Sequence, residues 1–244
     1  MDISGKTALL TGGLGSLGRA QAARLVEVGV AVTILERPDI EEGAARAAAL
    51  RAAWLPCDLN DLAKAQRVVA DAATAVGGFD ILINNAALII NRPFEEFSIQ
   101  EYEDQIRVNS SAAFALTIAC APSMKQKRWG KIVNFTSITL RGMLDGYVPY
   151  IASKGAMLGL TKSLARELGP HGICVNAVAP GAIASEAEER VFGHKAAEYS
   201  EWVIEHQSLK VRIRPDAVAE LVLFPVSPAS DMITGQNVGI DGGW

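Results

Sequence analysis

A phenol and an amine lie four residues apart in the sequence Tyr150-x-x-x-Lys154. At that spacing both side chains project from one face of a helix, where they can interact. A nearby cation stabilises the phenolate and lowers the pKa of a tyrosine from its ordinary value of about 10 toward neutral pH. The pair is therefore a candidate proton donor and acceptor. Tyr147 has no lysine at this distance, and we expect it to line a substrate pocket instead.

Two polar residues accompany the pair. Ser137 follows a predicted strand, 13 residues before Tyr150, and Asn109 falls in a long predicted helix. A tyrosine and a lysine at this spacing also occur by chance, so the joint presence of all four residues carries more weight than the pair alone. We treat Asn109, Ser137, Tyr150 and Lys154 as the candidate catalytic set.

A glycine-rich run, Thr11-Gly12-Gly13-Leu14-Gly15-Ser16-Leu17-Gly18, joins the first predicted strand to the first predicted helix. Glycines at such a turn let backbone amides approach a pyrophosphate, and the helix N-terminus adds partial positive charge. The run predicts a dinucleotide site. Its candidate contacts are Gly12, Gly15, Ser16, Leu17 and Gly18.

An acidic residue is expected about 20 residues further on, at the end of the second strand, where it bonds the adenosine ribose. Glu36 occupies that place. Its carboxylate can accept from a 2′-hydroxyl and would repel a 2′-phosphate, which favours NAD over NADP. Arg37 follows directly and could pair with that phosphate, so the two residues argue in opposite directions. Asp58 and Leu59, after the third strand, are expected beside the adenine.

Short apolar segments alternate with amphipathic ones along the whole chain. The strand-like segments are 7–10, 30–35, 53–56, 81–84, 131–135, 173–178 and 237–240, and the helical ones are 16–28, 40–50, 61–76, 101–127, 150–168 and 215–223. Asn60 and Asp61, and the capping box Ser98-x-x-Glu101, are start signals for helices. Strands that are apolar on both faces indicate a buried parallel sheet. We expect one α/β domain over residues 1–244, with a doubly wound parallel sheet of about seven strands and helices on both faces.

Residues 184–214 interrupt this alternation with many charged and aromatic side chains and no strand pattern. A long excursion late in a compact α/β domain is more often a functional lid or specificity loop than filler. The alternative is a solvated pair of helices.

The chain has 244 residues, of which 50% are hydrophobic and 20% charged, and a formal net charge of −4. This composition excludes a disordered chain, and mild acidity with scattered basic residues argues against nucleic-acid binding. No stretch is apolar enough to cross a membrane, and residues 1–6 show no charged-then-apolar leader. The three cysteines and three histidines lack metal-ligand spacing, so we expect no metal, and reduced thiols in a cytoplasmic protein.

Further motifs follow in order along the chain, namely Asn84-Asn85-Ala86-Ala87, Pro180-Gly181, Thr234-Gly235-Gln236 and Asp241-Gly242-Gly243. With the glycine run and the candidate catalytic set, they resemble the short-chain dehydrogenase/reductase family over essentially the whole chain. The resemblance implies a Rossmann-type fold and hydride transfer between NAD(H) and an alcohol, aldehyde or ketone.

By this resemblance Tyr150 is the general acid/base on the substrate oxygen, and Lys154 binds the nicotinamide ribose while lowering the pKa of Tyr150. Ser137 orients the substrate oxygen, and Asn109 holds a water in a proton relay from Lys154. The other residues implied to contact the cofactor are Asn85, Ala86, Pro180, Gly181, Ile183 and Ser185.

Two positions depart from the short-subunit branch of the family. Ser16 takes the place of a glycine, so the spacing Gly12-x-x-Gly15-x-x-Gly18 resembles the extended branch. The Ser16 hydroxyl is expected to contact a phosphate or to cap the helix. Ala87 replaces a usual glycine, a mild change that should not block binding.

The expected substrate pocket is mostly apolar, and its candidates are Leu88, Ile138, Thr139, Tyr147 and Trp202. Arg92 and Arg141 could anchor an anionic group. These residues favour a small or medium, partly apolar alcohol or carbonyl compound.

Two other functions stay open. The chain also resembles NADP-dependent 3-oxoacyl-carrier-protein reductases, which Arg128 fits but His171 and Glu36 do not. A non-catalytic NAD(H)-sensing protein is a remote alternative, because the catalytic set is complete. The resemblance further implies a homotetramer. The predicted helix 101–127 carries an apolar stripe, Ile106, Phe114, Leu116 and Ile118, that could face a partner or the sheet.

Overall fold

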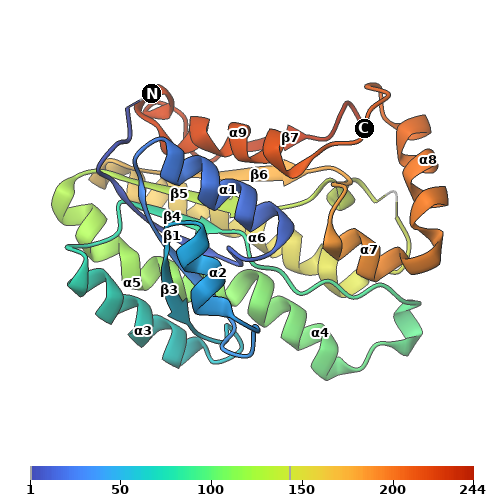
Figure 1. Ribbon diagram of the computed structural model, residues 1–244, viewed down its shortest axis with the longest axis horizontal. Helices are drawn as coiled ribbons and strands as arrows, with labels where there is room; N and C mark the ends of the chain where they lie inside the picture. Colours follow the sequence, from blue (N-terminus) through green and yellow to red (C-terminus); the bar gives the residue numbers. More distant parts are fainter. Residues whose placement is uncertain (1, 143) are drawn as a thin grey trace.

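The computed structural model describes residues 2–142 and 144–244. Seven parallel strands form one sheet in the order β3-β2-β1-β4-β5-β6-β7. They are β1 (Thr7–Thr11), β2 (Ala31–Glu36), β3 (Ala53–Pro56), β4 (Ile81–Asn84), β5 (Gly130–Phe135), β6 (Ile173–Pro180) and β7 (Asn237–Ile240). Helices cover both faces, so the predicted doubly wound, Rossmann-type sheet is confirmed (Figure 1).

The sheet is buried on both faces because its strands are apolar at consecutive positions. Leu9 and Leu10 are fully buried neighbours in β1, yet they belong to two separate hydrophobic clusters. Successive side chains of a strand point to opposite faces, so each cluster is the core of one side. Helices α1 and α9 pack together on one side, and α3 and α5 on the other (Figure 1).

The helices are α1 (Ser16–Glu27), α2 (Gly43–Ala49), α3 (Leu62–Ala75), α4 (Ile99–Ile106), α5 (Ala112–Lys127), α6 (Val148–Leu168), α7 (Glu186–Phe192), α8 (Ala196–His206) and α9 (Pro215–Val226). The predicted start signals are confirmed, since Asp61 caps α3 and the capping box of Ser98 and Glu101 opens α4. Helix α2 begins three residues later than predicted. Glu42 at its N-cap has a left-handed backbone with φ of 52°, which the helix cannot include.

The predicted helix over 101–127 is an unbroken helical run in the structure, but it begins at Ile99 and is not α-helical throughout. A π-helical stretch, Arg107–Ser111, separates α4 from α5. Single π-turns inside α-helices frequently mark functional sites. Asn109 lies within this stretch and is 1% exposed, so the π-helical stretch contributes a buried residue to the candidate site.

The apolar stripe of this region is divided between two environments. Leu116 is fully buried in the core, whereas Phe114 and Ile118 are 50% and 43% exposed. The stripe therefore does not face the sheet as a unit, and part of it is a surface of α5.

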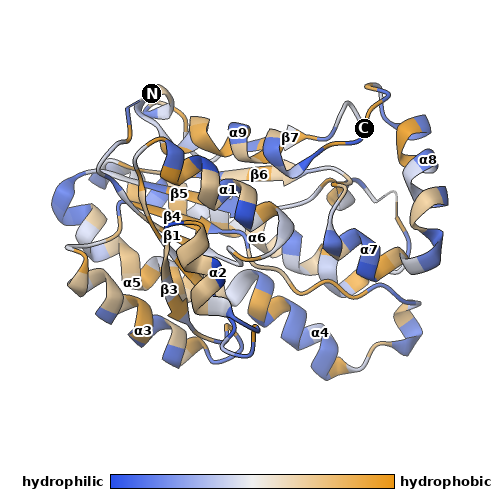
Figure 2. Cartoon of the chain, in the orientation of Figure 1, coloured by the Kyte–Doolittle hydropathy of each residue, from blue (hydrophilic) through white to orange (hydrophobic). Residues whose placement is uncertain are grey.

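Residues 184–214 contain the helical pair α7 and α8. A parallel bridge between Ile183 and Ile213 closes the base of the excursion, with the Ala184 amide donating to the Ile213 carbonyl at 3.1 Å. Figure 1 shows both helices at the end of the molecule where the C-terminus lies, and Figure 2 shows that α7 is largely hydrophilic.

Within the described residues, no helix combines the length and apolarity that a membrane span requires. The same residues contain no group of three or more histidine, cysteine, aspartate or glutamate side chains that could hold a metal ion.

Candidate active site

The glycine run and the Asn84–Ala87 motif lie beside each other at the carboxyl end of the sheet. They follow β1 and β4, which are adjacent strands although they are distant in sequence. At such a switch point the chain leaves in two directions and opens a crevice for ligands. The Asn85 amide donates to the carbonyls of Thr11 and Gly12 at 2.9 and 3.2 Å, which clamps the glycine run in place.

Glycine is required at two positions of this run. Gly12 has a φ of +66°, and a Cβ there would lie 2.9 Å from the Cα of Ala86. A Cβ on Gly18 would lie 2.1 Å from the Gly12 carbonyl oxygen. The backbone can therefore turn tightly and present its amides only without side chains, which fits the pyrophosphate of a nicotinamide dinucleotide.

Ser16 contacts a distant segment. The N-cap of α1 is Gly15 and no side chain caps it, so the cap expected for Ser16 is absent. Its hydroxyl accepts from the Glu186 amide at 3.2 Å, and the guanidinium of Arg19 pairs with the Glu186 carboxylate at 2.6 Å. The cofactor loop and the start of α7 are thus joined across 170 residues of sequence.

Glu36 lies at the end of β2, as predicted. Its carboxylate accepts from the amides of Leu14 at 3.4 Å and Arg37 at 3.2 Å, which holds it against the glycine run. The Arg37 side chain pairs with Asp39 at 3.3 Å.

The adenine-side candidates follow β3. Asp58 accepts from the Asn60 amide at 2.9 Å in the turn before α3, and Leu59 is buried in the core. Leu17 is half-buried and packs against the hydrophobic cluster on the other face of the sheet from Leu59. The Leu59 side chain therefore packs inside the protein, whereas the Leu17 side chain stays partly accessible.

Tyr150 and Lys154 lie one turn apart on α6, as the spacing predicts. The Lys154 ammonium lies 5.4 Å from the centre of the Tyr150 ring and donates to the Phe135 carbonyl at 2.8 Å. Lys154 is 2% exposed and Tyr150 is 9% exposed. The pair therefore occupies a dry position between α6 and the end of β5.

Asn109 connects the helix that carries this pair to the segment that follows β4. Its amide donates to the Leu88 carbonyl and to the Ser153 hydroxyl, both at 2.9 Å, and its oxygen accepts from the Leu88 amide at 2.6 Å. Ser153 in turn donates to the Tyr150 carbonyl at 2.6 Å. Sequence reasoning missed Ser153, although it lies between Tyr150 and Lys154, because only the fold shows that it meets Asn109.

Ser137 is held so that it can donate. Its oxygen accepts from the Thr139 amide at 3.2 Å and the Thr139 hydroxyl at 3.0 Å. A hydroxyl oxygen has two lone pairs, so both are used and its proton is free for another acceptor. Thr139, predicted as a pocket residue, therefore has a clear contact with Ser137.

Burial sets the protonation of this site. It raises the pKa of Tyr150 to about 12, an effect that the Ser137 hydroxyl partly opposes, and it lowers the pKa of Lys154 to about 7. The sequence predicts that Lys154 lowers the pKa of Tyr150, whereas burial in the structure raises that pKa. A buried ammonium is itself destabilised, so Lys154 supplies only part of the positive charge that would favour phenolate.

The nicotinamide-side candidates lie at the carboxyl end of β6. Pro180 is the last residue of the strand, and the Gly181 amide donates to the Ile240 carbonyl at 2.9 Å. Ile183 is buried, and the Ser185 hydroxyl caps α7 by accepting from the Glu188 amide at 3.3 Å.

The substrate-side candidates divide into two groups. Tyr147 is buried with its ring 6.0 Å from that of Tyr150, and Ile138 is buried beside Ser137. Leu88 is half-buried and is fixed by Asn109. Trp202 instead packs in an aromatic stack on α8, against Tyr199, His206 and Trp244.

The two arginines suggested as anionic anchors are already paired. Arg92 pairs with Glu101 at 2.7 Å, and Arg141 pairs with Asp241 at 3.0 Å. A mostly covered ion pair that sequence reasoning missed, Glu188 and Arg212, joins the two ends of the excursion at 2.6 Å. No spacing signal could have found it, because the partners meet only when the chain returns after α8.

A parallel sheet of this order, with a glycine cradle at its switch point, defines a dinucleotide-binding α/β protein. A family model described as enoyl-(acyl carrier protein) reductase matches residues 12–244. The short-chain reductase protein NovJ of Streptomyces niveus is 36% identical over 97% of this chain and 92% of its own length. D-xylose 1-dehydrogenase of Caulobacter vibrioides is 33% identical over 100% of this chain and 97% of its own.

A solved structure has a similar fold. It comes from Beutenbergia cavernae, is provisionally described as an NAD(P)-dependent gluconate 5-dehydrogenase, and holds NADP at low occupancy. Its TM-score is 0.93 at 29% identity, over 100% of this chain and 98% of that chain. The chain belongs to the short-chain dehydrogenase/reductase family and is an oxidoreductase with a nucleotide-binding fold.

Proposed function

We propose that the protein transfers a hydride between NAD(H) and a small-to-medium alcohol, aldehyde or ketone, with Tyr150 as the general acid/base. One observation carries this proposal: Ser137, Tyr150 and Lys154 lie together as buried residues near the carboxyl end of the sheet, where the glycine run also lies. The bound nicotinamide would supply or accept the hydride. The protein's part is to hold the substrate oxygen and to move its proton.

The protonation of the site supports reduction at neutral pH. With a pKa of about 12, Tyr150 keeps its proton and can give it to the oxygen of a carbonyl substrate. Ser137 donates a second hydrogen bond to the same oxygen. Oxidation needs Tyr150 to accept a proton, so the rate of oxidation should rise with pH.

Substitution of the phenol tests the enzymatic role. Tyr150→Phe removes the phenolic hydroxyl with its proton and keeps the ring. Tyr102→Phe, at an exposed tyrosine of α4, is the matched control. NADH oxidation with a panel of carbonyl compounds should fall by about 10²–10⁴-fold in Tyr150→Phe. Unchanged turnover in that variant would support the non-catalytic NAD(H)-sensing alternative instead.

Glu36 supports NAD as the preferred cofactor. Its carboxylate would repel a 2′-phosphate, and the neighbouring Arg37 is occupied by Asp39. Dissociation constants for NADH and NADPH test this in the parent, in Glu36→Ala and in Asp39→Ala. The first variant should lose discrimination and the second should improve NADPH binding by releasing Arg37. Tighter NADPH binding by the parent contradicts the proposal.

A carrier-protein-linked reductase is the second candidate, because the matching family model bears that description. Arg128, the basic residue that fits it, donates to the Pro170 carbonyl at 3.0 Å. Turnover of a 3-oxoacyl thioester on a carrier protein with NADPH, faster than any free carbonyl with NADH, would favour this candidate.

We also propose a homo-oligomer in the cytoplasm. Support for the oligomer comes from the family resemblance and from Phe114 and Ile118, two large apolar side chains on the surface of α5. The three cysteines are free and buried, which suits a reducing compartment. Light scattering of the parent and of Phe114→Glu measures the assembly, and a monomeric parent would contradict it.

A further inference from the structure

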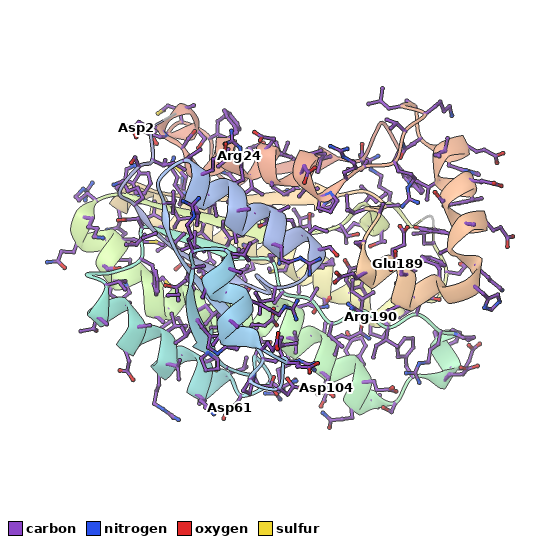
Figure 3. All side chains as sticks on the ribbon, in the orientation of Figure 1. Asp2, Arg24, Asp61, Asp104, Glu189 and Arg190 are labelled. Carbon is purple, nitrogen blue, oxygen red and sulfur yellow. The ribbon has the colours of Figure 1, made fainter. Side chains whose placement is uncertain are left out.

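A second buried lysine lies outside the proton-transfer site. Charged side chains normally lie at the protein surface, as those of Asp61, Glu189 and Arg190 do (Figure 3). Lys131, the second residue of β5, is instead 1% exposed. The proton-transfer site contacts the opposite end of this strand, at the Phe135 carbonyl, so it leaves Lys131 without a role.

Lys131 donates hydrogen bonds to three different groups. Its Nζ lies 2.7 Å from Oδ1 of Asp231, 3.3 Å from Oγ of Ser230 and 3.5 Å from Sγ of Cys174. An ammonium group has three protons, so each of these acceptors can take one. Lys131 and Cys174 are also direct partners in the register of β5 and β6, and their side chains lie on the same face of the sheet. The fold therefore holds the sulfur beside the amine.

Cys174 differs from the other two cysteines because it has this amine beside it. The Cys57 sulfur contacts the Asp58 carbonyl at 3.7 Å, and burial raises the pKa of the fully buried Cys120 to about 12. In the part of the chain that the structure describes, neither sulfur receives a hydrogen bond from a lysine. A positive charge close to a thiol stabilises the thiolate, which is the form that reacts with oxidants. We therefore expect Cys174 to react before the other two.

A short turn at the protein surface covers the lysine and the cysteine. The Cys174 thiol donates to the backbone carbonyl of Asp231 at 3.5 Å, so this turn lies against the sulfur. The Asp231 side chain is 53% exposed, and the next residue, Met232, is 96% exposed. Cys174 is itself 8% exposed. A small, neutral oxidant such as hydrogen peroxide needs to displace only this turn to reach the sulfur.

We propose that Cys174 and Lys131 form a redox-sensitive modification site, at which hydrogen peroxide leads to a covalent sulfenamide bridge between β6 and β5. In the first step the sulfur bonds to one oxygen of the peroxide and the O–O bond breaks. The other oxygen leaves as water with the thiol proton. The sulfur is oxidised to a sulfenic acid, and the peroxide is reduced to water.

The second step joins the two residues and needs no further oxidant. The Lys131 ammonium gives one proton to the Asp231 carboxylate at 2.7 Å, which is exposed enough to pass it to water. The neutral amine then attacks the sulfur of Cys174. An N–S bond forms, the S–O bond breaks, and the hydroxide leaves as water with a second proton from the nitrogen. Sulfenic acids condense with protein nitrogen atoms in this way, and a dithiol reverses the bridge by supplying two electrons and two protons.

Peptide mass spectrometry of the peroxide-treated parent tests the bridge. Free thiols are alkylated after the treatment, and the protein is digested with trypsin. We expect a peptide that joins Lys131 to Cys174, is lighter than its two parts by two hydrogen atoms, and is not cleaved after Lys131. Dithiothreitol should restore both the thiol and the cleavage. The parent treated in urea should give no linked peptide, because the contact between the two residues depends on the fold.

Three variants locate the chemistry. Cys174→Ser removes the sulfur, and Lys131→Arg keeps the positive charge but supplies no nucleophilic amine, so both should abolish the linked peptide. Cys57→Ala is the matched control and should keep it. Circular dichroism checks that each variant is folded.

Thermal unfolding gives a second readout. The bridge joins residues that are 43 positions apart, so it should raise the melting temperature of the parent by about 5 °C or more. The same peroxide treatment should not raise the melting temperature of Cys174→Ser. Oxidation at this site would then stabilise the fold.

Each outcome has a definite meaning at the peroxide dose where Met232, the exposed neighbour, first appears as its sulfoxide. No linked peptide at that dose, or a Cys174 that gains only oxygen, overturns the bridge. A linked peptide that retains an oxygen atom overturns the N–S bond. Equal modification of Cys57 or Cys120 overturns the selectivity for Cys174. The test needs no substrate, so it is independent of the proposed oxidoreductase function.

Discussion

Replacement of Lys154 by methionine should make the protein more stable while it removes activity. Burial lowers the pKa of this lysine from an ordinary 10.5 to about 7. The difference of about 3.5 units corresponds to about 5 kcal/mol at 1.36 kcal/mol per unit, as an upper bound on what the buried charge costs. Loss of the hydrogen bond to the Phe135 carbonyl returns about 1–3 kcal/mol of that gain. We expect a net gain of about 2–4 kcal/mol at pH 7 and below.

The gain should depend on pH with a definite sign. Below pH 7 the ammonium is charged in both the folded and unfolded states, so the folded state carries the full burial cost. Between pH 7 and 10.5 the unfolded chain binds the proton and the folded protein does not, and the cost falls by about 1.4 kcal/mol per pH unit. The advantage of the Lys154→Met variant should therefore shrink as the pH rises from 7 to 9.

Urea unfolding followed by circular dichroism at pH 6, 7, 8 and 9 measures this dependence. Lys162→Met is the control, because Lys162 lies exposed on the same helix and its replacement should change the stability by less than about 0.5 kcal/mol. The reasoning is refuted if Lys154→Met is less stable than the parent at pH 7, or if its gain is the same at pH 7 and pH 9.

Three further outcomes follow from the same site. The rate of alcohol oxidation should rise with pH without levelling off below about pH 12, since a Tyr150 pKa of about 12 leaves little phenolate at neutrality. A flat profile in steady-state assays would contradict this. Ser16→Gly should speed NADH release a few-fold in stopped-flow fluorescence, because it removes a hydrogen bond of about 0.5–1.5 kcal/mol to the start of α7. Thr139→Val should lower kcat by roughly tenfold with KM little changed, because it frees a Ser137 lone pair and misdirects the proton; an unchanged kcat would exclude that orientation.

The sheet and the catalytic set could be predicted from sequence because their signals are local. Apolar, β-branched runs defined the strands, and a helix period brought Tyr150 and Lys154 to one face. The π-turn at Asn109 could not be predicted in this way. Asn109 in this stretch donates to Ser153, 44 residues away, and such a contact forms only once α6 has packed.

The pKa shifts of the site could not be predicted from the sequence either. The direction of the Tyr150 pKa depends on how completely the fold removes water from it, and spacing carries no record of burial. Likewise the Ser16 position suggested a cap or a phosphate contact, but its partner is Glu186, 170 residues along the chain. Local sequence patterns therefore identify the candidate residues, whereas tertiary contacts determine their protonation and their hydrogen-bond partners.

Two ion pairs of unequal character hold the excursion 184–214: one joins it to the start of α1, and the other joins its own two ends. The Arg19–Glu186 pair is 37% and 50% exposed, whereas the Glu188–Arg212 pair is 12% and 15% exposed. Mobile ions weaken the first attachment and hardly reach the second, since the Debye length falls from about 10 Å at 0.1 M salt to about 3 Å at 1 M. Raising the ionic strength should therefore loosen α7 from the cofactor loop while its attachment to Arg212 persists, so cofactor exchange in this enzyme becomes a function of salt.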